Sequence, residues 1–110
     1  MAIKISGTTV IDDSRKMTNL RLNSTVIATN TNAVAGTIYH INGSGITLTL
    51  PSSPSAGDIV GWTNLTNDRT NILGNNGVPI MKLSENLTLD IAYSSKYVVY
   101  TDATNGWVFI

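Results

Sequence analysis

The amino-acid sequence predicts an all-β protein, an antiparallel β-sandwich of jelly-roll type with an extended N-terminal arm. Two observations carry this prediction. Isoleucine, valine and threonine supply 35 of the 110 residues, and these β-branched side chains favour strands. Short runs of alternating apolar residues also recur about every ten residues, separated by glycine, proline and asparagine. This pattern is typical of a sandwich and argues against a helical bundle.

The composition excludes several classes of protein. The chain has no cysteine, which rules out a disulfide framework and a thiolate metal site. Seven basic and seven acidic residues balance, whereas a nucleic-acid binder needs a basic surface. No apolar run approaches the roughly 20 residues of a membrane span, and the opening residues lack the apolar core of a signal peptide. We expect a protein that binds neither nucleic acid nor membrane and is made in the cytoplasm.

The first 19 residues differ from the remainder and form the expected arm. Ile3 and Ile5 alternate with Lys4, and residues 8–11 can form a short strand before an Asp-Asp-Ser sequence that signals a turn or a helix cap. Two interpretations are open for this segment. It is either an extended arm with one helical turn or an ordinary edge strand and loop. The β-sandwich domain is expected over 20–110.

The strands expected in the first half of this domain follow alternating apolar residues and end at turn signals. The clearest is 46–50, where three apolar residues alternate with threonine. Asn42-Gly43 precedes it and favours a tight turn, because both residue types tolerate positive φ. In the first run, the alternation that begins at Leu20 reaches Val26, which is expected to point inward. Strands are expected at 20–28, 37–41 and 46–50, with a loop over 29–35.

The second half continues the same pattern. Prolines in 51–57 end the preceding strand because they cannot donate to a ladder. Val60 and Trp62 alternate in the next run and are expected to face the core, with Ile59 on the other face. Asn105-Gly106 signals a terminal hairpin. Strands are expected at 58–65, 71–73, 78–83, 87–91, 96–101 and 107–110.

The last two strands are apolar on both faces, which indicates a subunit interface. A two-layer sandwich of this size buries one face of each sheet, so a second apolar face needs another surface to cover it. A further copy of this chain is the expected partner. The alternative is that a loop or the N-terminal arm covers this face. The candidate interface residues are Tyr97, Val99, Trp107 and Phe109.

No pattern in the sequence points to catalysis, a metal or a cofactor. His40 is the only histidine and lies in an expected strand, where a structural role is common, and no Gly-x-Ser-x-Gly motif accompanies it. The acidic residues fall at turns or on polar strand faces. In the asparagine-rich loop 64–76 only Asp68 carries negative charge, which is too few carboxylates for a typical calcium site. We expect no enzyme activity, metal or cofactor.

The aromatic residues allow one further interpretation, a carbohydrate-binding module or a small hydrolase. A sugar site would need an exposed row of aromatic side chains, and a hydrolase would need a carboxylate pair in a cleft. Trp62 and Trp107 lie in strand patterns for which burial is the usual outcome. Burial of both side chains would remove the main support for this interpretation.

Two stretches and the opening of the chain have a distinctive order of residues. Residues 46–58 read Ile-Thr-Leu-Thr-Leu-Pro-Ser-Ser-Pro-Ser-Ala-Gly-Asp, and residues 97–110 read Tyr-Val-Val-Tyr-Thr-Asp-Ala-Thr-Asn-Gly-Trp-Val-Phe-Ile. Together they resemble a module of tailed-bacteriophage structural proteins. The opening, 3–15, is similar to the start of virion appendage proteins, those of cyanophages especially. The resemblance implies a non-enzymatic β module, commonly a trimer, on a capsid or a tail fibre.

The function expected from this resemblance is that of a capsid decoration, or cement, protein on the outside of the virion shell. The partners are then the major capsid protein and further copies of the chain in a homotrimer. The alternative is a tail-fibre or tail appendage module for host attachment, although 110 residues leave little room for a fibre shaft. Apolar residues of the arm could add a strand to the capsid protein. The residues expected to contact it are Ile3, Ile5, Val10, Ile11 and Arg15.

Overall fold

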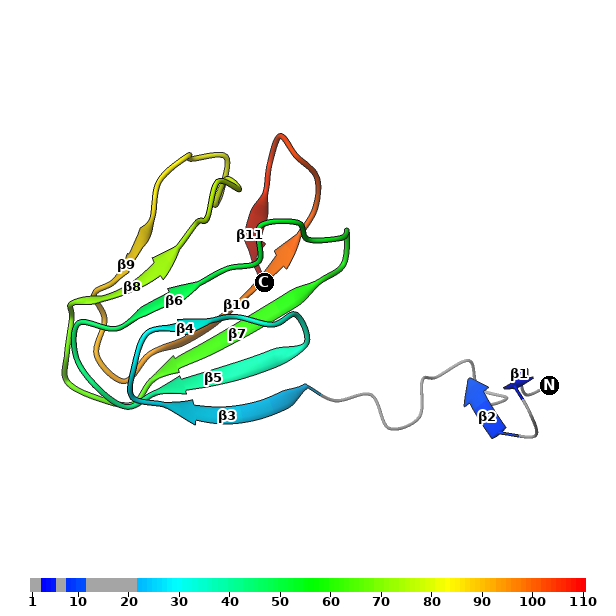
Figure 1. Cartoon of the computed structure of the whole chain (residues 1–110), viewed down its shortest axis with the longest axis horizontal. Helices are drawn as coiled ribbons and strands as arrows, with labels where there is room; N and C mark the ends of the chain where they lie inside the picture. The colour runs from blue at the N-terminus through cyan, green and yellow to red at the C-terminus, as the bar shows by residue number, and fades with distance from the viewer. Residues whose placement is uncertain (1–2, 6–7, 12–21) are drawn as a thin grey trace.

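The computed structural model describes residues 3–5, 8–11 and 22–110, and these residues form strands, turns and loops without a helix. A five-stranded and a four-stranded sheet face one another across a single core (Figure 1). The strands are β1 (Ile3–Ile5), β2 (Thr8–Ile11), β3 (Asn23–Ile27), β4 (Thr31–Asn32), β5 (Thr37–Ile41), β6 (Thr47–Thr49), β7 (Ile59–Asn64), β8 (Asn71–Gly74), β9 (Leu87–Leu89), β10 (Ser95–Tyr100) and β11 (Trp107–Phe109).

Each sheet combines parallel and antiparallel pairs. The five-stranded sheet has the order β11-β10-β7-β5-β3, in which β3, β5 and β7 are parallel to one another while β10 and β11 are antiparallel to their neighbours. The four-stranded sheet has the order β4-β6-β8-β9, in which only the pairing of β8 with β9 is antiparallel. β1 and β2 form a separate antiparallel pair.

The parallel pairs result from the way in which the chain winds between the sheets. From β3 to β8, successive strands alternate between the five-stranded and the four-stranded sheet. Each return adds a strand beside the one laid down before it, so Thr25, Tyr39 and Trp62 lie in one row across β3, β5 and β7. The chain therefore coils like a short two-sheeted solenoid before β9, β10 and β11 close it with antiparallel pairs.

This winding corrects the predicted topology. The β-rich architecture with two facing sheets is confirmed, but the expected antiparallel, jelly-roll arrangement is wrong for the pairs that join β3 to β5, β5 to β7, β4 to β6 and β6 to β8. The reason is that a strand connected through the opposite sheet shows the same length, alternation and turn signals as a strand in a hairpin. Sequence periodicity therefore identifies the strands but does not determine their neighbours.

The core lies between the sheets and contains most of the residues that the alternation placed inward. Ile46, Leu48 and Leu50 around β6 are buried, as are Val60 and Trp62 of β7, so these predictions are confirmed. Both tryptophans belong to this core, and Trp107 has no exposed surface. The Trp107 indole meets the Tyr100 ring edge to face, with centroids 5.6 Å apart. Aromatic burial of this kind contributes strongly to the stability of a small β domain.

Three element predictions are corrected. In β3, Val26 is 61% exposed and Ile27 packs against the core, because the inward residues of this strand have the parity opposite to the one predicted. The expected loop over 29–35 contains the two-residue strand β4. Residues 78–83 form isolated bridges instead of a strand, with positive φ at Met81 and Lys82. The helical turn that one interpretation placed in the arm after the Asp12-Asp13-Ser14 signal lies outside the described residues.

Two buried asparagine side chains connect loops that flank the strands. Asn71, which is fully buried at the start of β8, accepts a hydrogen bond from the Ile46 amide at 2.9 Å and donates to the Gly43 carbonyl at 3.1 Å. Asn64 at the end of β7 donates to the Asp68 carbonyl at 2.8 Å. Buried amides that satisfy backbone groups in this way replace the ladder bonds that turns cannot make.

Acid is expected to weaken the turns that carry Asp68 and Asp102. The Thr70 amide donates to the Asp68 carboxylate at 2.9 Å, and the Asn105 amide donates to the Asp102 carboxylate at 2.7 Å. These backbone hydrogen bonds lower the pKa of each carboxyl below its ordinary value of 3.8. A lowered pKa stabilises the folded state while the group is ionised, so the contribution is present above about pH 4 and lost as pH falls through the folded pKa.

The measurement is the urea midpoint of unfolding as a function of pH. We expect the midpoint to fall below pH 4. The variant Asp102→Asn should have a lower midpoint at pH 7 and a shallower fall in acid, because it no longer has the carboxylate that titrates. An acid slope equal to that of the wild type would contradict the role given to Asp102.

Candidate functional site

The outer face of the five-stranded sheet carries an apolar patch where β7, β10 and β11 lie side by side. Val99 of β10 is paired with Ile59 of β7 and with Val108 of β11, and directly paired residues share a face of the sheet. The neighbouring row pairs Tyr97 with Gly61. This outer patch consists of Ile38, Ile59, Tyr97, Val99, Val108 and Ile110.

The Tyr97 ring packs directly on the backbone of Gly61, which has no side chain to keep it away. A Cβ atom on Gly61 would lie 2.7 Å from Cδ1 of the Tyr97 ring and 3.2 Å from Cγ1 of Ile38. The ring therefore lies over the glycine backbone, and 37% of the residue remains exposed. An aromatic side chain fixed in this way has little conformational entropy to lose on binding, which is a property of interface anchors.

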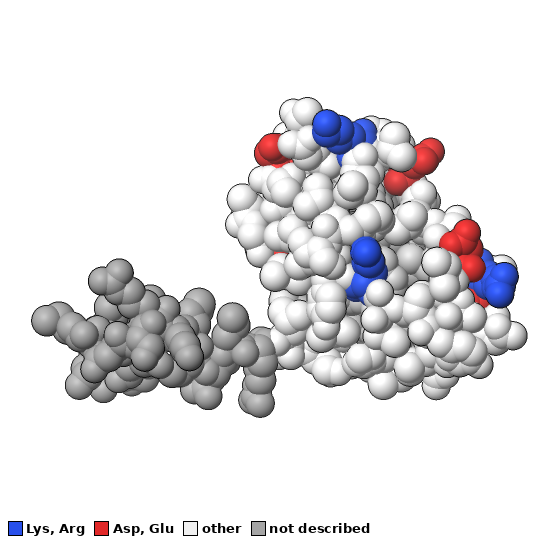
Figure 2. Space-filling model, turned by 180° about the vertical axis from the view of Figure 1, so that it is seen from behind, with Lys and Arg blue, Asp and Glu red and all other residues white. Residues whose placement is uncertain are grey.

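Charge is scarce on this part of the molecule. No lysine, arginine, aspartate or glutamate lies on the outer face of the five paired strands. Figure 2 shows one face of the described body, on which charged side chains gather at the top and along one edge and a single cation lies between them. Depletion of charge at the centre of an apolar patch is characteristic of protein interfaces.

The structure separates the four residues predicted for the oligomer interface. Tyr97 and Val99 lie on the outer patch. Trp107 lies in the core without exposed surface, so it has none to offer a partner. Phe109 is paired with the buried Val98 and therefore lies on the inner face, where it is 36% exposed at the sheet edge. The alternation in β11 was visible in the sequence, but its register against β10 was not.

The residues predicted to contact a capsid protein lie in the N-terminal strands or outside the described residues. Ile3 and Ile5 belong to β1, while Val10 and Ile11 belong to β2. The two strands pair antiparallel, with Ile3 opposite Ile11. Arg15 falls outside the described residues. Residues 8–11 form a strand, which both interpretations of the sequence allowed, and this strand pairs with residues 3–5.

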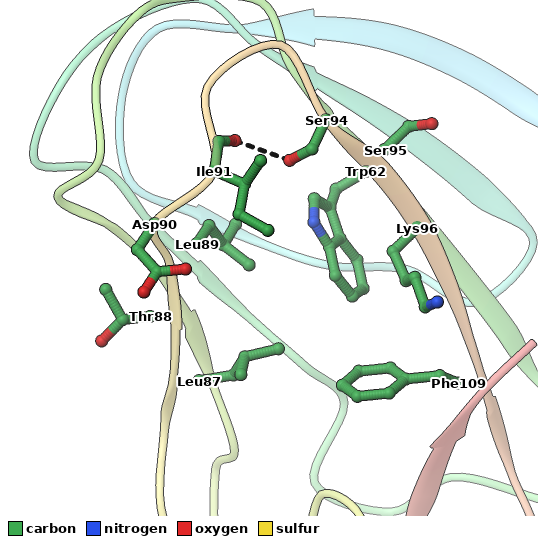
Figure 3. A pocket seen from close by; sticks show the side chains of 10 residues that line it. All are labelled: Trp62, Leu87, Thr88, Leu89, Asp90, Ile91, Ser94, Ser95, Lys96 and Phe109. Carbon is green, nitrogen blue, oxygen red and sulfur yellow. Dashed lines mark hydrogen bonds between the residues drawn. The ribbon is translucent and has the colours of Figure 1, made fainter.

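A second candidate surface is a groove at the edge of the sandwich where β9 faces β10 and β11 (Figure 3). Its larger hollow has a volume of about 380 Å³, and a smaller hollow of about 130 Å³ adjoins it and shares Leu87 and Phe109 as lining. One wall of the larger hollow comes from residues 87–91. The opposite wall contains Trp62, Lys96 and Phe109, with the Lys96 ammonium 5.4 Å from the centre of the Phe109 ring.

Sequence reasoning missed this groove. The alternating Leu87 and Leu89 predicted correctly that one face of β9 points inward. Nothing in the pattern showed that β9 and β11 are the last strands of their sheets. The space between these two edge strands is therefore open. The local signal that could have indicated the groove is the presence of the apolar residues Ile91 and Phe109 at strand ends, because such residues are usually covered.

The described residues contain no arrangement that resembles a catalytic or metal centre. His40 Nε2 lies 2.8 Å from the Ser24 hydroxyl on an open strand surface, and no carboxylate among the described residues hydrogen-bonds to the ring, as a catalytic relay requires. Within the same residues no three side chains of His, Asp or Glu come together to hold an ion. No helix in the described ranges is long and apolar enough to cross a membrane.

The carbohydrate-binding interpretation loses its main support. Trp62 is 3% exposed and Trp107 is fully buried, so neither offers a free ring face to a sugar. The exposed ring of Phe109 is covered on one side by Lys96. Comparison with known proteins adds no alternative, since neither the known protein families nor the curated proteins include a match to this chain.

Proposed function

We propose that this chain is a capsid decoration protein of a tailed bacteriophage, which binds the outside of the assembled shell and stabilises it. The observation that carries the proposal is the outer patch, an uncharged apolar face on a small β domain. Such a face is suited to permanent contact with other protein subunits and unsuited to turnover of a substrate. The resemblance of 46–58 and 97–110 to phage virion modules supplies the biological context.

In this proposal the outer patch joins copies of the chain into a homotrimer. Tyr97 and Val99 provide the centre of the contact, and Ile38, Ile59 and Val108 surround them. The major capsid protein is the second partner. Because its binding surface repeats across the assembled shell, several weak contacts made by one trimer combine into tight attachment. Binding to the assembled state alone stabilises that state by mass action.

The alternative proposal is a tail-fibre or tail appendage module for host attachment. The opening residues 3–15 support it, since their order is similar to that of virion appendage proteins. The two proposals differ in the surface that the protein recognises. A decoration protein binds the shell and ignores host cells, whereas an attachment module binds cells or their surface glycans.

The test is to mix the purified protein with undecorated capsids and with host cells, and to measure bound protein after sedimentation. We expect saturable binding to capsids and none to cells. Binding to cells without binding to capsids would overturn the decoration proposal and favour the tail-appendage proposal. Binding to neither would remove both proposals.

A matched pair of variants tests the outer patch. We expect Tyr97→Lys to raise the dissociation constant of self-association at least tenfold, because a charge would enter the centre of the contact. The domain should remain folded, since Tyr97 is 37% exposed. Ser95→Lys is the control, because it places the same charge on the same strand and face beside the patch. Light scattering gives the mass, and a trimer formed equally well by Tyr97→Lys would contradict the patch as interface.

A further inference from the structure

The groove between β9 and β11 is an unfilled position at the edge of the β-sandwich. On one side the ladder on β11 has already begun, since the Trp107 amide donates to the Pro79 carbonyl at 2.9 Å and the Met81 amide donates to the Trp107 carbonyl at 2.7 Å. Ile80 thus forms a parallel bridge with Trp107. The ladder stops after this single bridge, and Phe109 is the next position along β11.

A strained turn ends the ladder at this point. Met81 has φ 50° and Lys82 has φ 71°, two consecutive left-handed residues that are not glycine. This conformation is unfavourable for residues other than glycine and is concentrated at functional positions. It directs the chain away from β11 before residues 84–87 reach β9. The turn therefore leaves unfilled the position beside β11 that a continued strand would have occupied.

The groove offers two adjoining apolar hollows, which suit an extended strand with two apolar side chains. Residues of a strand that point the same way are about 6.6 Å apart, so they are close enough to serve neighbouring hollows. The two hollows meet at Leu87 and Phe109, and further apolar residues line each of them. Several are largely exposed, including Leu83 at 56% and Ile91 at 66%. Exposed apolar side chains around a concave site indicate a binding partner that covers them.

The chain itself contains a segment with the required pattern. Residues 3–5 read Ile-Lys-Ile, with two large apolar residues in alternation, and β1 is paired along one edge with β2 alone. Charge also favours the match. The first 21 positions hold four basic and two acidic residues, whereas 22–110 hold three basic and five acidic residues, so the two segments have net charges of opposite sign. The strand does not fill the groove of its own chain, because β11 is paired with β10 and bridged by Ile80, not by β1.

We propose that the groove between β9 and β11 binds residues 3–5 of a second copy of this chain, with Ile3 and Ile5 in its two hollows. Copies are thereby linked by exchange of their N-terminal strands, in addition to any contact through the outer patch. The inference does not depend on attachment to a capsid. It assigns Ile3 and Ile5 to a contact between copies and leaves the proposed shell contact to Val10, Ile11 and Arg15.

The absence of native cysteine permits a direct test by disulfide trapping in the full chain. Ile5→Cys is mixed with a second full-length variant, either Ile91→Cys or Leu83→Cys, and the mixture is oxidised. Each partner position is exposed, so both variants should fold, and circular dichroism checks this. The matched control is Val34→Cys, an apolar residue that is 64% exposed near the opposite edge of the sandwich.

We expect a cross-linked dimer between Ile5→Cys and at least one groove variant, formed at least tenfold faster than with the Val34→Cys control. Mass spectrometry of the linked peptides identifies the heterodimer. Equal rates for the groove and control positions would overturn the proposal, as would the absence of cross-links. A double variant, Ile5→Cys with Ile91→Cys, that closes within one chain at every concentration would also overturn it. No capsid is present in this test, so its outcome is separate from that of the proposed function.

Discussion

Replacement of Gly106 by alanine is expected to destabilise the domain by about 3–5 kcal/mol. Gly106 has φ 70°, and a Cβ atom there would collide with the Pro79 carbonyl oxygen and lie 2.6 Å from its carbon. Both contacts are with backbone, so no side-chain rotation can relieve them. The neighbouring Trp107 amide donates to that same Pro79 carbonyl. The substitution should therefore break the bridge that fixes residues 79–81 against β11.

Gly57 provides a control that separates conformational strain from collision. It has φ 92°, similar to Gly106, but a Cβ atom there would meet nothing within 4 Å. Gly57→Ala should cost only the left-handed penalty, about 1–2 kcal/mol. Denaturant unfolding of the two variants gives both values. Equal losses would show that the close approach of Pro79 to Gly106 is not maintained in solution.

Replacement of Asn71 by leucine is expected to cost about 2–4 kcal/mol, although the two side chains are similar in size. Leucine would leave the Ile46 amide and the Gly43 carbonyl without the side-chain partner that each has in the folded protein. The unpaired, buried Ile46 amide costs about 1–3 kcal/mol, and the part-buried Gly43 carbonyl adds a smaller loss. The effect is thus a loss of hydrogen bonding in a site that excludes water, since Asn71 has no exposed surface.

The matched substitution is Asn67→Leu in the nearby exposed loop. Asn67 contributes no side-chain hydrogen bond to the described structure, so this change should stay within about 0.5 kcal/mol. The comparison uses the midpoint and slope of urea unfolding. If both variants lost the same stability, the buried amide would have no special role, and the cost would arise from leucine in the unfolded chain.

The sequence was sufficient to predict most of the strands but not the pairing between them. Alternation at Ile46, Leu48 and Leu50 identified β6 and its buried face correctly, because burial on one side of a strand imposes a period of two. The same alternation carries no information about which strand lies alongside. Strands whose connections pass through the opposite sheet therefore could not be distinguished in the sequence from strands joined in hairpins.

The candidate sites were predictable to different degrees for the same reason. Tyr97 and Val99 were selected because both faces of their strand are apolar, and they lie together on the outer patch. Trp107 and Phe109 were assigned to the same face although the register of β11 turns them inward. Local patterns determine which residues share a face of one strand, whereas the face to which they belong is set by a partner distant in sequence.

The alternation of strands between two sheets affects how the domain can open. Each turn of the winding contributes one strand to each sheet, so the first turn, β3 and β4, has a neighbouring turn on one side only. It can detach by losing the β3–β5 and β4–β6 ladders while the pairs of β7 with β10 and of β8 with β9 stay intact. Unfolding can then begin at β3 and β4 and proceed strand by strand, as in repeat proteins, with local stability that increases toward β7. If the domain is attached to a surface whose curvature changes, β3 and β4 can separate from the rest of the sandwich while Trp107 stays buried.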